Sequence, residues 1–265
     1  MKRLLTIVTT VMLTSIAMAD LVTYENKISS PTDGGGGPAL WFKNGSSKSG
    51  EHILNSGSST ATNTAYRLGG ALYTDLWGNA NKAFGSTNAT MPAVANSTGL
   101  FTTGAVGTVS FLFKTPSANP GTIQTLFSQG VSFTVALNTN GMIRIAHDNS
   151  GTKYSNVVSV ATDTWYYFAM KWDTAKTGND LTWYLGTTNS TLNSGNLTIS
   201  SAGLASASIQ LDGLKAPMQE VAIWQRELSD TSIQAQFGAI PEPATAGLFV
   251  VASAVVLFLR NMITR

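Results

Sequence analysis

The sequence predicts an all-β protein folded as an antiparallel sandwich. From Gly107 onward it consists of short runs rich in β-branched and aromatic residues, and Gly, Asn, Pro or Asp punctuates nearly every gap between them. Many short strands at this spacing are typical of a sandwich. The length of 265 residues fits one β-domain, and a hydrophobic content of 43% can supply its core.

The second half contains nine expected strands and one expected helix. The strands are Thr108–Thr115, Thr122–Ser128, Ser132–Asn138, Met142–His147, Val157–Ala161, Trp165–Asp173, Leu181–Gly186, Ser208–Leu214 and Gln219–Gln225. Asn138 to Gly141 predicts a hairpin turn between the third and fourth strands. Within the domain between the two ends, helix is expected only at Asp230–Phe237, where Ser229 can cap its N-terminus.

The first half predicts mostly loops. Residues 20 to 100 are rich in Gly, Ser, Thr and Asn, and both Asp33–Pro38 and Asn55–Thr64 have the composition of loops. Strands are expected here only at Ala39–Lys43 and Tyr66–Tyr73.

Two strands show which side chains face the core. Because successive side chains alternate across a strand, one face of the Trp165–Asp173 strand carries Tyr166, Phe168, Met170 and Trp172. On the next strand, Leu181, Trp183 and Leu185 share a face. We expect both sets to be buried.

The N-terminus has the order of segments of a secretion signal. Lys2 and Arg3 precede a short apolar stretch, and Ala17 and Ala19 are the small residues that signal peptidase needs. Residues 1–19 are therefore expected to be a signal peptide, with Asp20 the first residue of the mature chain. A buried N-terminal helix is the alternative.

The C-terminus, residues 239–265, has the pattern of a membrane-sorting tail. The prolines of Pro241-Glu242-Pro243 make an extended break before an apolar run. A transmembrane helix is expected over about 244–263, with Arg260 and Arg265 holding its far end on the cytoplasmic side.

This tail resembles the PEP-CTERM sorting signal of Gram-negative bacteria that produce exopolysaccharide. The resemblance implies processing by an exosortase-type enzyme, a transient anchor in the inner membrane, and a final place at the cell surface or outside the cell. The family usually ends in a dense arginine cluster, whereas residues 261–264 separate the two arginines here. A permanent anchor therefore remains an alternative, which also places the domain outside the cytoplasm.

The domain between the two ends, residues 20–238, resembles the laminin-G-like (LamG) group of concanavalin A-like jelly rolls. The resemblance covers about Gly99–Phe237. It is carried by Thr108–Lys114 as opening strand, Asp163–Ala169 as turn and strand, and Gln219–Trp224 as closing strand. The strand ending at Gly186 lacks the Asp-Gly that often follows its counterpart, which leaves the next hairpin open.

Charge and cysteine content exclude several classes. Residues 20 to 240 carry 12 cations and 13 anions without a basic cluster, so nucleic acid is not an expected partner. The chain has no cysteine, which excludes disulfides, a thiol nucleophile and a thiolate metal site.

The acids and histidines do not predict an enzyme. Glycosidases need two suitably spaced carboxyl groups, and the E-x-D-x-x-E run by which this fold supplies them is missing here. Glu220 has Met218 and Ala222 two positions away on its strand, so we interpret it as a solvent-facing residue. His52 in a loop and His147 at a strand end predict no metal pair, and no G-x-S-x-G elbow occurs.

Calcium is the one metal that the resemblance implies, because some LamG members hold it through loop oxygens. Candidate ligands are Asp148, Asp173, Asp180 and Asp212, whose carboxylates are hard oxygen donors. The alternative is that these residues form turns.

Sugar binding would use exposed aromatic side chains. Trp41 and Trp77, in the loop-rich half, are the candidates, with a core position as the alternative for each. The expected function is a non-catalytic surface or matrix protein that binds a glycan, exopolysaccharide or another extracellular ligand. A passive structural component of the envelope and a divergent glycoside hydrolase are the two alternatives.

Overall fold

The structure is a computed structural model, and it describes most of the domain between the two ends. The described residues are 21–43, 48–49, 52–58, 64–66, 71–85, 106–129, 133–146, 154–176, 178, 180–187, 190–198, 209–211 and 217–240.

The largest element is an eight-stranded antiparallel sheet. Its strand order is β14-β13-β12-β7-β16-β6-β5, and β1 also pairs with β16. The strands are β14 (Asn193–Leu197), β13 (Leu181–Gly186), β12 (Trp165–Asp173), β7 (Val106–Lys114), β16 (Met218–Trp224), β6 (Ala83–Gly85), β5 (Ala71–Tyr73) and β1 (Leu40–Phe42). Sequential neighbours such as β12 and β13 pair directly, whereas β7 reaches both β12 and β16 across long stretches of chain.

Two smaller sheets complete the strands. The five-stranded sheet contains β11 (Tyr154–Ser159), β10 (Met142–Ala146), β9 (Phe133–Leu137), β8 (Gln124–Gln129) and β15 (Ile209–Leu211), in that order. The three-stranded sheet contains β2 (Lys48–Ser49), β3 (His52–Leu54) and β4 (Thr64–Tyr66). The predicted all-β antiparallel sandwich is confirmed, and Gly141 has the positive φ of 73° that the expected β9–β10 turn needs.

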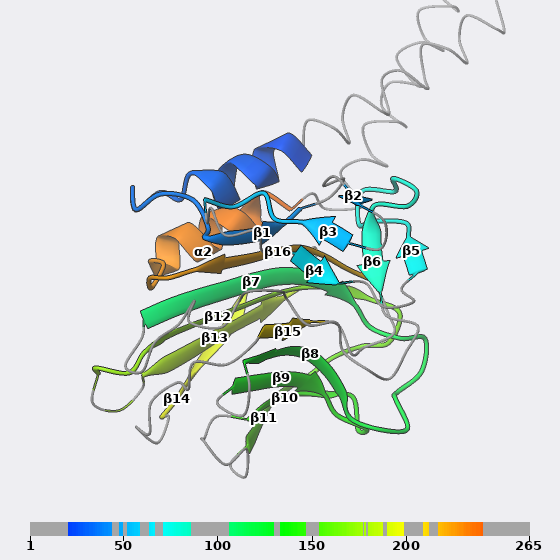
Figure 1. The fold of residues 1–265 in the computed structure, drawn as a ribbon. Helices are drawn as coiled ribbons and strands as arrows, with labels where there is room; N and C mark the ends of the chain where they lie inside the picture. Colours follow the sequence, from blue (N-terminus) through cyan, green and yellow to red (C-terminus); the bar gives the residue numbers. More distant parts are fainter. Residues whose placement is uncertain are drawn as a thin grey trace, which may run out of the picture.

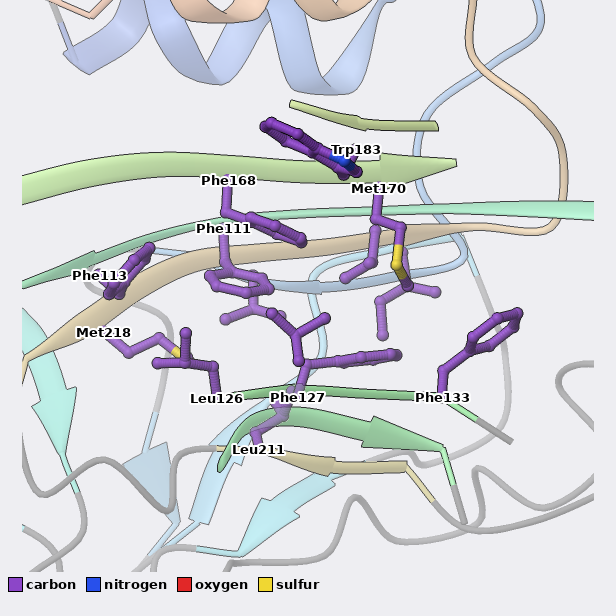
Figure 2. Packing of buried hydrophobic residues seen from close by; sticks show 14 of the residues in the cluster. Phe111, Phe113, Leu126, Phe127, Phe133, Phe168, Met170, Trp183, Leu211 and Met218 are labelled. Carbon is purple, nitrogen blue, oxygen red and sulfur yellow. The ribbon is translucent and has the colours of Figure 1, made fainter. Parts of the chain in front are cut away.

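The main core fills the space between the eight-stranded and five-stranded sheets. Phe111 and Phe168 stack with ring centroids 5.2 Å apart, and both are fully buried. Figure 2 shows these rings pointing toward Leu126 and Phe127 of β8 on the opposite sheet. The predicted inward faces of β12 and β13 are confirmed, because the alternate residues from Tyr166 to Trp172 and from Leu181 to Leu185 all lie in this cluster.

A layer of helices covers the other face of the eight-stranded sheet. Helix α2 (Asp230–Gly238) and a helix over residues 21–29 lie side by side above β1 and β16 (Figure 1). The prediction that helix is confined to α2 was wrong. The 21–29 helix was missed because only Tyr24 and Ile28, one helical turn apart, are completely buried on it, which is a weak apolar pattern.

Ser229 caps α2 as predicted. Its side-chain oxygen accepts a hydrogen bond from the backbone N–H of Ser232 at 3.1 Å, which satisfies one of the unpaired donors at the helix start.

The first half departs from its prediction in two further ways. The expected strand Tyr66–Tyr73 is two strands, β4 and β5, that belong to different sheets. The region also contains β2, β3 and β6, which are two or three residues long and carry too few side chains to show a period.

The expected signal peptide and sorting tail lie outside the described residues. This applies to Ala17, Ala19, Pro241-Glu242-Pro243, Arg260 and Arg265. Within the described ranges, no helix has the length and apolar character needed to span a bilayer.

Replacing Phe168 with alanine should lower the free energy of unfolding by about 3–5 kcal/mol, because a fully buried ring leaves a cavity between the sheets. Ile123→Ala is the control, since Ile123 is 45% exposed and should lose no more than about 0.5 kcal/mol. Urea denaturation of both variants measures the difference, and equal losses would contradict the assignment of the core.

Candidate functional site

The most unusual backbone in the eight-stranded sheet is at Glu220. Strand β16 pairs with β7 through Gln219↔Leu112 and Ala222↔Ser110, so β16 has one extra residue, a β-bulge. Glu220 has a φ of 52°, a left-handed conformation that side chains other than glycine rarely adopt. On its other edge, β16 pairs with β6 at Met218 and with β1 from Val221 onward, so the bulge lies between these two partners.

The bulge buries the Glu220 side chain against Trp41. Glu220 is 0% exposed, and its Oε2 accepts a hydrogen bond from the indole N–H of Trp41 at 2.9 Å. The interpretation of Glu220 as solvent-facing was therefore wrong. Trp41 is only 7% exposed, so it is not the open stacking surface that was predicted, and the alternative core position holds for this residue.

Two further aromatic residues complete the surroundings of Glu220. Tyr24, from the 21–29 helix, lies with its ring centroid 5.7 Å from the Trp77 ring. Burial raises the pKa of the Tyr24 phenol well above its usual value, and the nearby Tyr167 and Glu220 add to this effect. Trp77 is half-buried at the edge of the layer, so its predicted role in stacking on a sugar remains a prediction.

Gln219 ties the Trp77 loop to the bulge. Its Oε1 accepts the backbone N–H of Leu76 at 3.0 Å. The same loop is closed by Asp75, whose carboxylate accepts the backbone N–H of Asn79 at 2.7 Å and the side-chain N–H of Asn79 at 3.0 Å. The loop that positions Trp77 is thus held by the hydrogen bonds between Asn79 and Asp75 within the loop and by one hydrogen bond to Gln219 of β16.

We call Tyr24, Trp41, Trp77, Gln219 and Glu220 the Glu220 cluster. Three of its buried polar atoms, the Tyr24 hydroxyl, the Trp77 indole nitrogen and the Gln219 amide nitrogen, have no hydrogen-bond partner in the described part of the chain. Such atoms are uncommon in native interiors and each calls for an explanation. The cluster offers aromatic faces, several donors and one carboxylate acceptor, the mixture of apolar wall and few polar groups that is typical of small-molecule sites.

A second polar group, centred on Lys171, fastens α2 to the sheet. Lys171 contacts Asp230 at 2.5 Å and Glu227 at 3.3 Å, and the Tyr184 hydroxyl donates to Asp230 at 2.7 Å. The hydrogen bond from Lys171 is the main cause that lowers the pKa of Asp230. Because every acid here is engaged with a cation or a hydroxyl, we assign this group to structure.

A third polar group fastens the loop that follows the 21–29 helix. Asp33 accepts from the Arg226 guanidinium at 2.8 Å and from the backbone N–H of Ser229 at 3.1 Å. Arg226 thereby holds the pKa of Asp33 far below its usual range. A Cβ at Gly35 would lie 2.3 Å from Cζ of Arg226, so a side chain there would force the guanidinium to move away from Asp33.

Two of the four expected calcium ligands, Asp173 and Asp180, lie within the described residues. Asp173 and Asp180 come together at the two ends of the β12–β13 hairpin, where the backbone N–H of Asp173 donates to the carbonyl of Asp180 at 2.9 Å. The Asp173 carboxylate accepts the backbone N–H of Ala175 at 3.0 Å, which is the turn-forming role that was the alternative. Asp148 and Asp212 lie outside the described residues, and within the described ranges no group of three acids or histidines is placed to hold a metal.

The histidines do not change this picture. His52 belongs to strand β3 instead of the expected loop, and His147 lies outside the described residues.

Trp41→Phe should lower the free energy of unfolding by about 1–3 kcal/mol, because it keeps the ring but removes the donor to a buried carboxylate. Glu220→Gln is the matched control, since its amide oxygen can still accept from Trp41 and the loss should be smaller. A larger loss for Glu220→Gln than for Trp41→Phe would contradict the importance of this hydrogen bond.

Asp33→Asn should be less stable than the wild type at pH 7 by about 0.2–1 kcal/mol, the usual range for a partly exposed ion pair. The folded-state pKa of Asp33 is depressed, so its stabilisation is present above the unfolded pKa and is lost as pH falls through the folded one. Denaturation curves between pH 7 and 2 should show the two proteins converging below about pH 4. A difference that persists unchanged in acid would contradict the ion pair.

Comparison with known proteins yields matches in structure but not in sequence. No protein-family model and no curated protein match the chain. Similar solved structures include Trypanosoma rangeli sialidase in complex with sialic acid, with a TM-score of 0.54 and 11% identity over 86% of this chain and 38% of that one. The botulinum neurotoxin serotype D binding domain matches with a TM-score of 0.53 and 14% identity over 80% of this chain and 52% of that one.

A third match is the receptor binding domain of botulinum neurotoxin mosaic serotype C/D, with a TM-score of 0.51 and 12% identity over 79% of this chain and 51% of that one. The chain thus spans about two-fifths of the sialidase and half of the toxin domains. At these identities the likeness shows the fold alone, a sheet-rich sandwich.

Proposed function

We propose that the chain is an exported, non-catalytic protein whose concanavalin A-like jelly roll binds carbohydrate, with the Glu220 cluster as the binding site. The proposal places the protein at the cell surface or in the extracellular matrix. An exopolysaccharide of the producing cell is the expected ligand class.

The observation that carries the proposal is the chemistry of the Glu220 cluster. A sugar ring offers an apolar face for aromatic side chains and hydroxyl groups that both accept and donate hydrogen bonds. Trp77 and Tyr24 supply rings 5.7 Å apart, the three unpartnered donors supply N–H and O–H groups, and Glu220 contributes a carboxylate, one oxygen of which accepts from Trp41. Backbone strain at Glu220 agrees with a functional position, because strained residues concentrate at such sites.

The structural neighbours support the ligand class by analogy only. The sialidase structure contains sialic acid, and the toxin domains are described as binding domains. Because one fold can host many functions, the residues of the Glu220 cluster carry the proposal and the neighbours add to it.

The proposal includes the absence of catalysis, and the residues next to Glu220 on β16 and β7 support it. Glycoside hydrolysis by the usual routes needs two carboxyl groups flanking one bond. The residues two places from Glu220 are Met218 and Ala222, and its neighbours across the bulge are Ser110 and Leu112 of β7. None of these side chains is acidic.

Export and sorting rest on the two ends of the sequence. Residues 1–19 direct secretion, an exosortase-type enzyme removes the tail at Pro241-Glu242-Pro243, and the helix over about 244–263 anchors the protein until then. The prediction is that the protein recovered from the cell begins at Asp20 and lacks the final apolar helix. Intact-mass measurement checks both ends, and an unprocessed cytosolic chain would contradict this route.

Binding is tested on residues 20–240 with an array of neutral and acidic polysaccharides, in the presence and absence of Ca²⁺. Trp77→Ala should weaken binding at least tenfold, as expected for the loss of about 1–3 kcal/mol of stacking and hydrogen bonding. Ile123→Ala, an exposed apolar residue of similar character, should bind as the wild type does. Absence of any ligand would favour the passive structural role, and release of reducing sugar would favour the hydrolase.

A further inference from the structure

The 21–29 helix and the loop after it form the roof of the Glu220 cluster. Tyr24 and Ile28 point into the layer above β1 and β16 and are 0% exposed. Beneath them lie Trp41 and Glu220, which are almost completely buried. This segment, which we call the cover (residues 21–33), therefore separates Glu220 from solvent on this side of the sheet.

The apolar attachment of the cover is small. Only two fully buried apolar side chains hold the helix itself, whereas the central strands β7, β12 and β16 are buried at nearly every position. The Tyr24 hydroxyl is also buried in this interface without a hydrogen-bond partner in the described residues. A buried donor without a partner lowers the stability of the contact between the helix and the sheet. Segments with few buried apolar contacts are those that open locally.

The remaining attachment is polar, and it includes hydrogen bonds from the backbone N–H of Ser229 to Asp33 and from Arg226 to the carbonyl of Gly36. Lys43 pairs with Glu25 at 3.1 Å, and Arg226 pairs with Asp33 at 2.8 Å. The hydroxyls of Thr32 and Ser232 lie 3.0 Å apart. These ion pairs are partly exposed, so each contributes little and is screened by salt.

A glycine run connects the cover to β1. Gly34 and Gly36 have φ values of 73° and 81°, conformations that glycine adopts freely. The run lies between the Asp33 contact and strand β1, so a change of backbone angles there would swing the helix without disturbing the sheet. Hinges are typically such short segments that absorb large changes in φ and ψ.

We propose that the cover is a hinged lid that swings about Gly34–Gly37 to admit the sugar and closes over it. This proposal rests on the proposed function for the identity of the ligand. The hinge motion itself concerns the free protein and is measured without any ligand.

The first test locks the lid with a disulfide. The Thr32→Cys/Ser232→Cys variant places two cysteine side chains where hydroxyls now lie 3.0 Å apart, so the two side chains are neighbours that oxidation can join. Because the chain has no cysteine of its own, no other thiol can interfere. The oxidised variant should bind the glycan found on the array at least tenfold more weakly than the reduced variant, and the reductant should leave wild-type binding unchanged.

The second test measures opening directly by hydrogen exchange of the wild-type protein. Amides of residues 24–29 should exchange at least tenfold faster than those of β7 and β12, because the lid opens while the sandwich stays folded. Arg226→Gln should speed this exchange a further two- to fivefold, the factor that corresponds to one partly exposed ion pair. Lys114→Gln is the control. It removes the Lys114–Asp163 ion pair, which involves no residue of the cover, and the exchange of residues 24–29 should stay at the wild-type rate.

The outcomes separate the two proposals. If the wild type binds no glycan, the proposed function fails, and hydrogen exchange still decides on the lid. If residues 24–29 exchange together with β7, or if the oxidised variant binds as well as the reduced one, the lid is overturned while the binding function stands.

Discussion

The structure depends on one constraint: the central strands of the eight-stranded sheet are buried on both faces. Strands β7, β12 and β16 are buried at nearly every position, not at alternate ones. One face is covered by the five-stranded sheet, and the other must be covered as well, because exposed apolar surface on this scale is unfavourable. Helix α2 and the 21–29 helix provide that second cover, and the candidate site lies beneath them.

The two faces are covered by different chemistry. The inner core is built mainly of Phe, Leu, Ile and Val, which need no polar partner. The outer layer has a larger share of Tyr and Trp, which are five of its twelve buried members, and several of its buried donors have no partner in the described residues. Charge is also concentrated there. Although only 11% of the chain is charged, every ion pair between described residues except Lys114–Asp163 lies in or against the helix layer.

The sequence predicted the fold where local signals and tertiary structure agree. The strands after Gly107 have apolar runs and clear turns, and α2 has a capping serine, so their positions were predicted to within a few residues. Strand β14 was missed because Asn193–Leu197 is almost wholly polar. Its place is set by β13, where the Trp183 ring lies so close to Gly195 that a Cβ there would approach its Cζ2 to 2.7 Å. Such a signal exists only in three dimensions.

Tertiary contacts that leave no local sequence signal also explain why the candidate site was only partly predicted. Trp41 and Trp77 were chosen for their loop-rich surroundings, and the structure brings both to one cluster, but through a residue that the sequence misplaced. A regular strand would turn Gln219 and Glu220 to opposite faces, and the bulge instead brings the Gln219 side chain to the Trp77 loop and the Glu220 side chain to Trp41. Nothing in the local sequence announces the bulge, since glycine, the residue that best tolerates a φ of 52°, is absent there. A layer made only to seal the sheet has no need of a strained acid or of unpaired donors, and the proposal of a polar ligand rests on their presence beneath the 21–29 helix.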